Sequence, residues 1–558
     1  MSHSKIETAL LGVLKEMGVA EPAVDLERPR DPSHGDVASN VAMTLARELK
    51  LAPRQIAEQI TELLDLEAAG VEAVEIAGPG FLNFRLSSRA VASVLPDILA
   101  NDEAWGRSET GGGARVMVEF VSANPTGPLH IGHGRQAALG DAICSLLTWT
   151  GWDVHREFYY NDGGRQIELL ALSVYARYLE GFGDEAEIPG GGYHGGYVAE
   201  IAERLTEDVG EKYRESVSEQ DLDTIRALAV SILRAEQDRD LGDFGVIFDE
   251  YYLESSLYDG GRVEDTIKAL KETGLVYEHE GATWLKTTEF GDQKDRVMVR
   301  SNGLPTYFLP DVAYHLHKWQ RGFHRVINVQ GSDHHGTVAR VRSGTQALGL
   351  PQGYPEYVLH QMVRVTRDGQ DVKFSKRAGS ALSLRELYEE VGVDVTRYFF
   401  QMRKPDAQML FDVDAALDQS DTNPVYKVQY AHARMCSIFA KAGIEAESIE
   451  AGSTDLSVLG HELERELVKN LSEFTEVLER SARQSTPHAL CEYLEQTAGS
   501  TNGWYHAGNP SRNPKLAVLS DDAELRQARL VLARAVKIVL RNGLAILGIS
   551  APRRMDRA

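Results

Sequence analysis

The sequence predicts an α/β protein with three domains: a doubly wound parallel-sheet domain, a smaller α/β domain before it and an all-helical domain after it. Three observations support this prediction. The 558 residues exceed the ~100–200 that one domain typically holds. Strand-like and helical patterns alternate between residues 115 and 348, and beyond about residue 424 only helical periodicity remains.

Residues 1–108 are expected to form the small N-terminal α/β domain. Helical patterns cover residues around 5–17 and 36–65. Strand-like runs follow at 74–76 and 81–86, separated by the turn residues Gly78, Pro79 and Gly80. A polar, glycine-rich stretch at 106–113 then predicts a linker to the next domain.

Residues 109–423 are expected to form the doubly wound domain. A β-branched run at 115–121 predicts a strand buried in a parallel sheet. Further elements are predicted as a helix at 131–149, a strand at 154–160, a helix at 165–180, a strand at 326–330 and a helix at 336–348. An insertion at about 181–300 interrupts this alternation, and its role stays open at this level.

Residues 424–558 are expected to form the helical domain, with helices at about 423–443, 458–482, 486–498 and 522–547. The last helix carries basic residues that share one side at 100° per residue, namely Arg526, Arg529, Arg534, Lys537 and Arg541. We therefore expect a basic face on this helix, although a solvated face with no partner is the usual fate of such charge runs.

The charge distribution is uneven along the chain. There are 59 basic and 83 acidic residues, which gives a net charge of −24. Residues 1–423 hold 42 basic and 67 acidic residues, whereas residues 424–558 hold 17 and 16. The total argues against a protein that coats nucleic acid non-specifically, because phosphates would be repelled over most of the surface. It leaves room for a local basic surface in the last domain.

The cysteines and the apolar runs restrict the class of protein further. Cys144, Cys436 and Cys491 are scattered, so we expect reduced thiols, with no disulfide framework and no cysteine-rich zinc site. The N-terminus mixes charges into its apolar residues, unlike a signal peptide, and no run approaches the ~20 apolar residues of a membrane span. A cytoplasmic protein without a membrane partner is expected.

The most specific motif lies where the strand at 115–121 gives way to the helix at 131–149. His130 and His133 are three residues apart at the helix start, so they share a face, and Gly132 keeps that face open to a ligand. The free N–H groups of the first helical turn and two imidazole donors are suited to binding a phosphate. A capping or surface pair of histidines is the alternative.

Two further motifs follow in the sequence. Gly331-Ser332-Asp333-His334-His335 comes directly after the strand at 326–330. Lys373-Phe374-Ser375-Lys376-Arg377 comes shortly after the turn Asp368-Gly369, and its two lysines are suited to closing over the β- and γ-phosphates of a nucleotide. Alone, the second motif is typical of a solvated basic loop.

In this order, the three motifs resemble those of class I aminoacyl-tRNA synthetases. His130–His133 matches the HIGH motif, and Lys373–Arg377 matches the KMSKS loop with Phe in place of Met and Arg in place of the final Ser. The resemblance implies a Rossmann-type catalytic domain, ATP as a substrate with Mg²⁺, and catalytic roles for His130, His133, Lys373 and Lys376. It also implies ATP contacts from Ala123, Asn124, Pro125, Thr126, Gly127, Pro128, Leu129, Ile131, Gly132, Gly331, Asp333, His334, His335 and Ser375.

Four residues extend the resemblance to arginyl-tRNA synthetases. Glu119 and Asn124 are five apart around the HIGH element, and Tyr307 and Asp311 are four apart downstream. In that family the matching residues contact the substrate arginine, whose planar guanidinium is best recognised by carboxylates. The alternatives are a strand-end salt bridge for Glu119 and an ordinary helix start for Tyr307 and Asp311.

The same resemblance implies two regions that bind tRNA(Arg). The N-terminal domain is expected to meet the tRNA elbow through Phe81 and Asn83, although Phe81 is equally suited to a core position. The helical domain resembles the family's anticodon-binding domain. Its expected contacts are Tyr426, Tyr430, Arg529, Lys537 and Arg541.

The predicted function is therefore ATP-dependent attachment of L-arginine to tRNA(Arg) through an arginyl-adenylate, by a monomer. The insertion at 181–300 is shorter than the large editing domains of some class I enzymes, and arginine's charge makes editing unnecessary. Alternatives are a class I enzyme specific for glutamate or cysteine, and a non-catalytic tRNA-binding paralogue. A small nucleotidylyltransferase explains the first motif but not the helical domain.

Overall fold

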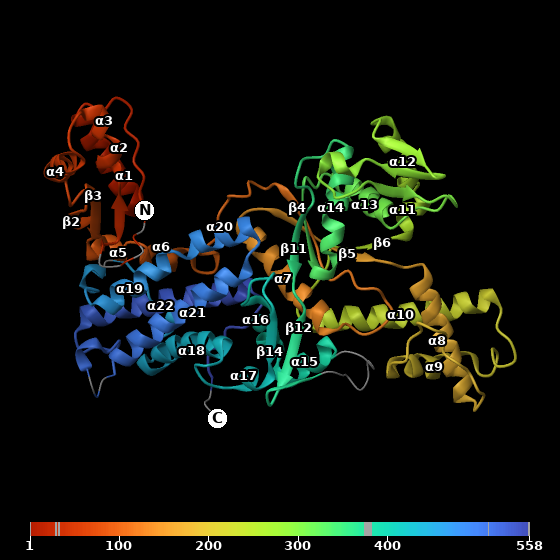
Figure 1. Cartoon of the computed structure of the whole chain (residues 1–558). Helices are drawn as coiled ribbons and strands as arrows, with labels where there is room; N and C mark the ends of the chain where they lie inside the picture. Colours follow the sequence, from red (N-terminus) through yellow and green to blue (C-terminus); the bar gives the residue numbers. More distant parts are fainter. Residues whose placement is uncertain are drawn as a thin grey trace.

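The computed structural model describes residues 2–27, 29, 31, 34–372, 382–452, 454–509, 511 and 513–555. The molecule is elongated (Figure 1). The N-terminal and C-terminal domains lie at one end, the parallel sheet lies in the middle, and the helical part of the insertion lies at the other end. The predicted α/β architecture with a helical last domain is confirmed.

The N-terminal domain contains a three-stranded antiparallel sheet in the order β1-β3-β2. Its elements are α1 (Ser2–Glu16), β1 (Val37–Ser39), α2 (Val41–Thr44), α3 (Ala46–Leu49), α4 (Pro53–Leu63), β2 (Val71–Ala77) and β3 (Phe81–Leu86). The two predicted strands are confirmed, but the prediction of one helical segment over 36–65 is wrong. Residues Val37–Ser39 are fully buried against β3 as a strand, and Lys50, with φ of 53°, ends α3 before Pro53 starts α4.

Short helices connect this domain to the rest of the chain. They are α5 (Ser88–Ala92), α6 (Leu95–Asn101) and η2 (Asp102–Ala104). Arg465 on α19 (Glu462–Ser472) donates to Ser88 Oγ and to the Leu86 carbonyl, both at 2.7 Å. The N-terminal domain is therefore anchored on the helical C-terminal domain.

The central sheet has five parallel strands in the order β11-β10-β4-β5-β6. The strands are β4 (Arg115–Glu119), β5 (Asp153–Tyr160), β6 (Glu250–Leu253), β10 (Arg325–Gly331) and β11 (Glu356–His360). The helices α7 (Ile131–Trp149), α13 (Phe308–Gln320) and α14 (His335–Ala347) connect or flank these strands. Since β5 and β10 lie on opposite sides of β4, the carboxyl end of β4 is the switch point where such sheets bind ligands.

The insertion predicted at about 181–300 contributes one strand to this sheet. Its residues 250–253 form β6, which pairs in parallel with β5. Four residues are too short a run for periodicity to distinguish from a loop. The remaining elements are α8 (Arg165–Gly181), α9 (Gly196–Val209), α10 (Glu219–Asp243), α11 (Ser255–Asp259), α12 (Arg262–Glu272), β7 (Val276–His279), β8 (Ala282–Leu285), η3 (Thr287–Phe290) and β9 (Arg296–Val299).

A second small sheet, which the sequence did not predict, follows the central one. It contains β12 (Val363–Arg367), β13 (Gln370–Asp371) and β14 (Met409–Asp412), and β12 pairs in parallel with β14. The helices around it are α15 (Leu384–Val391), α16 (Val393–Gln401) and α17 (Val413–Leu417). These elements link the catalytic domain to the helical domain.

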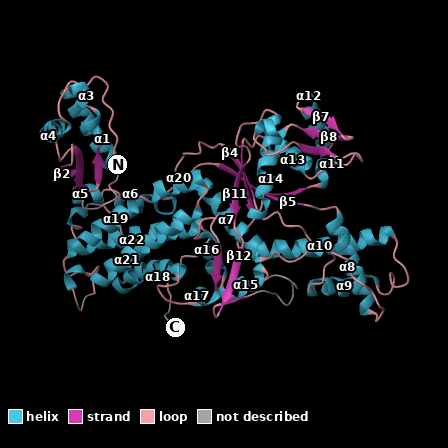
Figure 2. Cartoon of the chain, in the orientation of Figure 1, coloured by secondary structure: helices cyan, strands magenta, loops and turns pink. Residues whose placement is uncertain are grey.

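The described part of the C-terminal domain is helical, as predicted (Figure 2). Its helices are α18 (Pro424–Ala442), α19, α20 (Phe474–Gln484), α21 (Pro487–Ala507) and α22 (Ala523–Ile546), with the single turns η5 (Ala446–Ser448), η6 (Leu456–Val458) and η7 (Pro514–Leu516). Across the described chain, no helix is both long enough and apolar enough to cross a membrane.

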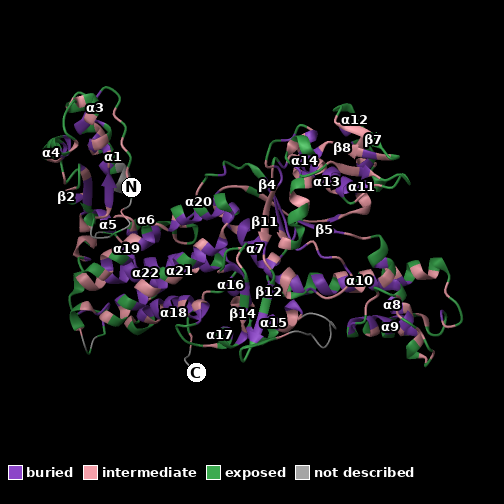
Figure 3. Ribbon diagram, viewed as in Figure 1, coloured by how far each residue is buried: buried purple, intermediate pink, exposed green. Residues whose placement is uncertain are grey.

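The expected basic face of the last helix is wrong. Figure 3 shows α22 as mostly buried, because α6, α18, α19 and α21 pack around it. Arg529 is 2% exposed and its Nε lies 2.6 Å from Glu464 Oε1, while Lys537 Nζ lies 2.6 Å from Glu447 Oε1. Arg541 pairs with Asp102 at 2.6 Å. Arg529 and Lys537 thus hold the helical domain together and Arg541 ties it to η2, so ion pairs already engage these three cations.

Candidate functional site

The loop after β4 starts with a strained turn. Val121 and Ser122 have φ of 68° and 43°, a left-handed conformation that is uncommon for non-glycine residues and costly for a β-branched one. Ser122 Oγ donates to Glu119 Oε1 at 3.1 Å and accepts from the Tyr159 N–H at 3.2 Å. These bonds fix the turn, which directs the following loop across the carboxyl end of the sheet.

The two histidines of the HIGH element cap α7. His130 Nδ1 accepts from the N–H groups of Gly132 at 3.1 Å and His133 at 3.4 Å. His133 Nδ1 accepts in turn from the His130 N–H at 3.3 Å, and the rings stack with their centroids 3.7 Å apart. Because each Nδ1 accepts a bond, the hydrogen-bond network assigns the ring proton to Nε2. Capping and ligand binding are therefore compatible, since Nε2 is free to donate to a ligand.

The surroundings keep both rings neutral. Desolvation lowers the pKa of His130, although the charge of Asp333 partly opposes this effect. Burial lowers the pKa of His133 well below its usual value, and His130 and His360 add to that shift. At neutral pH the pair therefore presents two neutral N–H donors at a helix N-terminus.

The Gly331 motif lies beside the histidines. Gly331 ends β10 and pairs with His360 of β11, and η4 (Ser332–His334) and α14 follow. A Cβ at Gly331 would lie 2.3 Å from Asp333 Oδ1, so a side chain at this position would displace the exposed Asp333 carboxylate. Asp333, His334 and His335 are exposed, so this loop is open to a ligand.

Sequence reasoning missed His360. It is 3% exposed at the end of β11, and burial lowers its pKa to about 4. Its electrostatic effect on His130 and His133 places it in the same group. The signal available was the apolar run at 357–359 followed by a histidine, at the edge where parallel strands bring their ligand-binding residues.

The lysine motif, with Lys373, Ser375 and Lys376, lies outside the described residues. The segment that follows it is described. The Leu384 N–H donates to the Leu129 carbonyl at 2.7 Å, and the Ile131 N–H donates to the Leu382 carbonyl at 3.3 Å. The chain leaving the lysine motif is thus bonded directly to both sides of His130.

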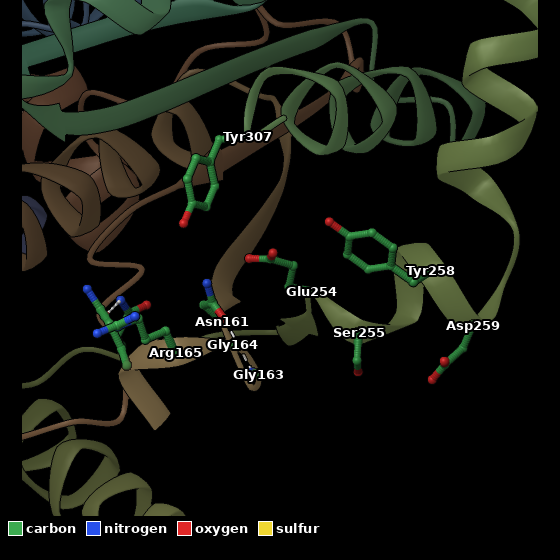
Figure 4. Close-up of a pocket in the computed structure, with 11 residues that line it drawn as sticks. Asn161, Gly163, Gly164, Arg165, Glu254, Ser255, Tyr258, Asp259 and Tyr307 are labelled. Atoms are coloured by element: carbon green, nitrogen blue, oxygen red, sulfur yellow. Dashed lines mark hydrogen bonds between the residues drawn. The ribbon is translucent and has the colours of Figure 1, made fainter. Parts of the chain in front are cut away.

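A cavity of about 630 Å³ opens next to the loop after β4 (Figure 4). Tyr307, Glu254 and Tyr258 point their side chains toward its middle. Of the four predicted arginine contacts, Asn124 and Tyr307 line this cavity, whereas Glu119 and Asp311 do not. The full lining is Asn124, Asn161, Gly163, Gly164, Arg165, Gln166, Glu254, Ser255, Tyr258, Asp259 and Tyr307.

Glu119 is held by a buried cation. It is 5% exposed and pairs with Lys318, which is 0% exposed and also donates to Asn328 Oδ1 at 3.3 Å. The strand-end salt bridge considered from the sequence is therefore present. Lys318 was missed, although it lies seven residues after Asp311 and so shares its helix face.

Asp311 lies in an acidic environment in the first turn of α13. Burial, followed by the charges of Glu119 and Glu254, raises its pKa to about 7, while Arg340 and Lys318 act in the opposite direction. Glu254, which the sequence analysis missed, has its own pKa raised by burial. A cation that binds here lowers the pKa of these carboxyl groups and so favours their ionised form.

The described residues include one cluster with the composition of a metal site, made of His155, Glu157 and Glu250. Arg321 occupies it, with its guanidinium 2.7 Å from Glu157 Oε2 and 2.5 Å from Glu250 Oε2. The pKa of Glu157 is lowered to about 2 against the opposing effect of burial. The cluster is therefore an internal ion-pair network.

The aromatic residues predicted to meet tRNA are only partly accessible. In β3, Phe81 is half-buried and Asn83 is 6% exposed. Tyr426 is 7% exposed and stacks on the half-buried Tyr430, with ring centroids 5.7 Å apart. Burial limits how far Asn83 and Tyr426 reach a base without local movement.

The fold and the site together define the class. A parallel sheet with its HIGH histidines at the switch point, a glycine–acid–histidine loop on the neighbouring strand and a helical last domain are those of a class I aminoacyl-tRNA synthetase. The chain matches the class I (R) tRNA synthetase catalytic domain at residues 94–412, the arginyl tRNA synthetase N-terminal domain at 4–86 and the DALR anticodon-binding domain at 428–555.

Similar proteins specify the family. The chain is 50% identical to an arginine–tRNA ligase of Cupriavidus necator over 597 aligned positions, which cover 99% of each chain. It is also 50% identical to one of Geotalea daltonii, with 96% and 95% covered. The solved structure of Thermus thermophilus arginyl-tRNA synthetase matches 99% of both chains with a TM-score of 0.73 and 26% identity. The chain belongs to the arginyl-tRNA synthetase family.

Proposed function

We propose that this arginine–tRNA ligase joins L-arginine to AMP in a cleft at the carboxyl end of the central sheet, formed by the α7 histidines and the cavity beside Tyr307, and then transfers the arginyl group to tRNA(Arg). One observation carries the proposal. Two neutral histidine donors lie at the N-terminus of α7, and three carboxyl groups that act on one another, those of Glu119, Glu254 and Asp311, lie around the start of α13. The histidine donors are suited to binding phosphates, and the carboxyl groups are suited to binding a guanidinium.

ATP occupies the half of the cleft next to α7. The Nε2–H groups of His130 and His133 stabilise the charge that develops on the phosphates, and Lys373 and Lys376 close over them. The exposed Asp333, His334 and His335 meet the ribose. Further contacts come from Ala123, Asn124, Pro125, Thr126, Gly127, Pro128, Leu129, Ile131, Gly132, Gly331 and Ser375.

Mg²⁺ arrives with ATP and neutralises phosphate charge when bound. The residues present fit this arrangement, because Asp333 offers one exposed carboxylate beside the histidines and a magnesium ion held by phosphates and water needs no protein cage.

Arginine occupies the other half. We assign recognition of the guanidinium to Asp311 and Glu119 on the family resemblance, although neither is among the residues that line the cavity. Asn124 and the exposed ring of Tyr307 do line it, so Asn124 orients the polar groups of the substrate and Tyr307 closes over it. Positioning supplies most of the catalysis, because the protein performs no covalent step of its own.

Two displacements complete the reaction. A carboxylate oxygen of arginine attacks the α-phosphorus of ATP, and the bond to pyrophosphate breaks. A hydroxyl of the 3′-terminal ribose of tRNA then attacks the arginyl carbonyl, its proton leaves, and AMP departs. As the family resemblance implies, we expect arginine activation to require tRNA.

The tRNA lies along the molecule. Residues 1–108 meet its elbow through Phe81 and Asn83, residues 109–423 hold its acceptor end, and residues 424–558 bind the anticodon, with the half-buried Tyr430 stacking on a base. We propose a monomer that acts in the cytoplasm. Sedimentation at working concentration and cell fractionation test these two points.

Aminoacylation of total tRNA tests the function. Arginine, glutamate and cysteine are offered separately, with wild type and Asp311→Ala. We expect arginine alone to be attached, by the wild type only. Attachment of glutamate or cysteine would support a different class I specificity, and no attachment at all would support a non-catalytic tRNA-binding protein. Pyrophosphate exchange at equal rates with and without tRNA would contradict the expected tRNA dependence.

A further inference from the structure

The helical part of the insertion extends into the catalytic cleft. Helices α8, α9 and α10 share a hydrophobic core of their own, separate from the core of the central sheet. The long helix α10 runs from this core back to the sheet (Figure 1). Its last turns lie against the loop that precedes the HIGH element.

Two buried side chains of the insertion hold that loop by its backbone. Gln237 on α10 is 1% exposed, and its Nε2 donates to the carbonyls of Asn124 at 3.1 Å and Gly127 at 2.9 Å. Tyr197 on α9 is 5% exposed, and its hydroxyl donates to the Thr126 carbonyl at 2.8 Å. Three of the four carbonyls at 124–127 are thus bound by residues more than 70 positions away in sequence.

The insertion and the loop at 124–127 are in close van der Waals contact as well as hydrogen-bonded. A Cβ added at Gly127 would lie 3.2 Å from the Tyr197 hydroxyl, so the loop rests directly on this side chain. Removing either donor leaves a carbonyl without its partner in a partly buried site, which costs more than the lost bond itself. The loop would therefore have to move to find water.

Both ends of the loop act on substrates. Asn124 lines the cavity, with its Nδ2 donating to Gln166 Oε1 at 2.6 Å, and Leu129 leads directly into His130. A displacement of the loop therefore displaces an arginine contact and a phosphate donor together. Misplacement by about 1 Å is enough to cost roughly 10²-fold in rate.

Helix α10 also holds the segment that follows the lysine motif. Arg385 on α15 lies with its Nε 2.8 Å from Asp240 Oδ1 and its Nη2 3.0 Å from Asp243 Oδ2. Asp240 is 1% exposed and lies three residues after Gln237, on the same side of the helix. One helix of the insertion thus contacts both the loop that precedes the HIGH element and the helix that follows the lysine motif.

We propose that Gln237 and Tyr197 are positioning residues for arginine activation, and that the insertion serves to hold the loop at 124–127 in its catalytic geometry. This inference rests on the proposed function, because its readout is the activation of arginine. Neither side chain touches substrate; each acts through the backbone of the loop.

The test measures tRNA-dependent pyrophosphate exchange with varied arginine and ATP. Tyr197→Phe removes one bond to the loop. Its matched control is Tyr175→Phe, which removes a 3.0 Å bond from the same kind of hydroxyl to the Tyr213 carbonyl, within the insertion. We expect kcat/KM for arginine to fall about 3- to 10-fold in Tyr197→Phe and to stay unchanged in Tyr175→Phe.

A second pair of variants tests the stronger contact. Gln237→Met keeps the side-chain volume and removes both donors, and Gln220→Met is its control at an exposed position of the same helix. We expect a fall of roughly 10²-fold in kcat/KM for Gln237→Met and no change for the control. In Gln237→Glu, protonation restores one donor, so activity relative to wild type should recover as the pH falls, whereas Gln237→Met should show no such recovery.

The inference is overturned if folded Tyr197→Phe and Gln237→Met both keep wild-type kcat/KM, or if Tyr175→Phe loses as much activity as Tyr197→Phe. A lower melting temperature without a kinetic change would likewise show a purely structural role. Failure of the proposed function would give a different result, because the wild-type protein itself would then not activate arginine.

Discussion

The two halves of the cleft use the same physical effect in opposite ways. Next to α7, desolvation keeps His130 and His133 neutral, and a neutral imidazole is already a competent donor to phosphate. Around α13, burial and two neighbouring acids raise the pKa of Asp311 to about 7, although a carboxylate must be ionised to pair with a guanidinium. The nucleotide half is therefore ready before ATP binds, whereas the arginine half is completed by the charge of its substrate.

The largest expected effect is the loss of arginine activation when the charge of Asp311 is removed. Asp311→Asn keeps the shape and removes the charge, so we expect kcat/KM for arginine to fall about 10³-fold, as for the loss of one partner in a buried charge pair. Pyrophosphate exchange in the presence of tRNA measures it. Asp265→Asn, at an exposed aspartate of α12, is the control. Equal activity of the two variants would show that Asp311 does not recognise the substrate.

The next prediction concerns the stability of the helical domain, away from the cleft. Arg529→Met leaves Glu464, which is 1% exposed, as a buried unpaired charge, and we expect a loss of about 3–5 kcal/mol of stability in the C-terminal domain. Denaturant unfolding followed by circular dichroism measures it. The double variant Arg529→Met/Glu464→Met should regain most of the loss. A stable Arg529→Met that binds tRNA poorly would instead support the basic face predicted from the sequence.

A third prediction concerns the nucleotide half. In His130→Asn the side chain still caps α7, because asparagine is a preferred N-cap residue, but the Nε2–H donor is lost. We expect kcat to fall about 10²- to 10³-fold with an unchanged melting temperature. If His130→Asn kept full activity and His130→Ala did not, capping alone would account for this histidine.

The smallest expected effect is a pH dependence confined to the arginine half. Since a proton competes with the guanidinium for Asp311, the KM for arginine should rise about tenfold per pH unit below 7 and level off above it. The KM for ATP should change little between pH 7 and 8, because burial holds the pKa values of His130 and His133 below the usual 6.5 and both rings are neutral there. Initial rates from pH 5.5 to 8.5 measure both values. An Asp311→Asn variant with the wild-type slope would assign the proton to another group.

The sequence was sufficient where function depends on local pattern. His130 caps a helix because it follows a strand and a loop, and Gly331 leaves room for the carboxylate of Asp333, two residues on. Both facts depend on residues within a few positions of each other. The helical domain was predicted for the same reason, since periodicity is local.

The sequence alone did not predict the features that depend on packing between residues far apart in the chain. The spacing of Arg529 and Lys537 is that of an exposed basic face, but α22 is enclosed and its cations pair with Glu464 and Glu447. Lys318 and Gln237 reach the cleft through contacts across 199 and 113 positions. The periodicity of a sequence does not show which distant residues pair with one another. The roles of Lys318 and Gln237 could therefore be recognised only from the fold.

The central claim is that arginine itself completes the charge of its pocket, and calorimetry tests it directly. Arginine is titrated into the enzyme–tRNA complex at pH 6, in two buffers of different ionisation enthalpy. With a pKa of about 7 for Asp311, we predict the release of about 0.9 proton per arginine bound, and almost none at pH 8.5. Asp311→Asn should release none at either pH. Binding by the wild type without proton release at pH 6, or with equal release by the variant, would contradict the account.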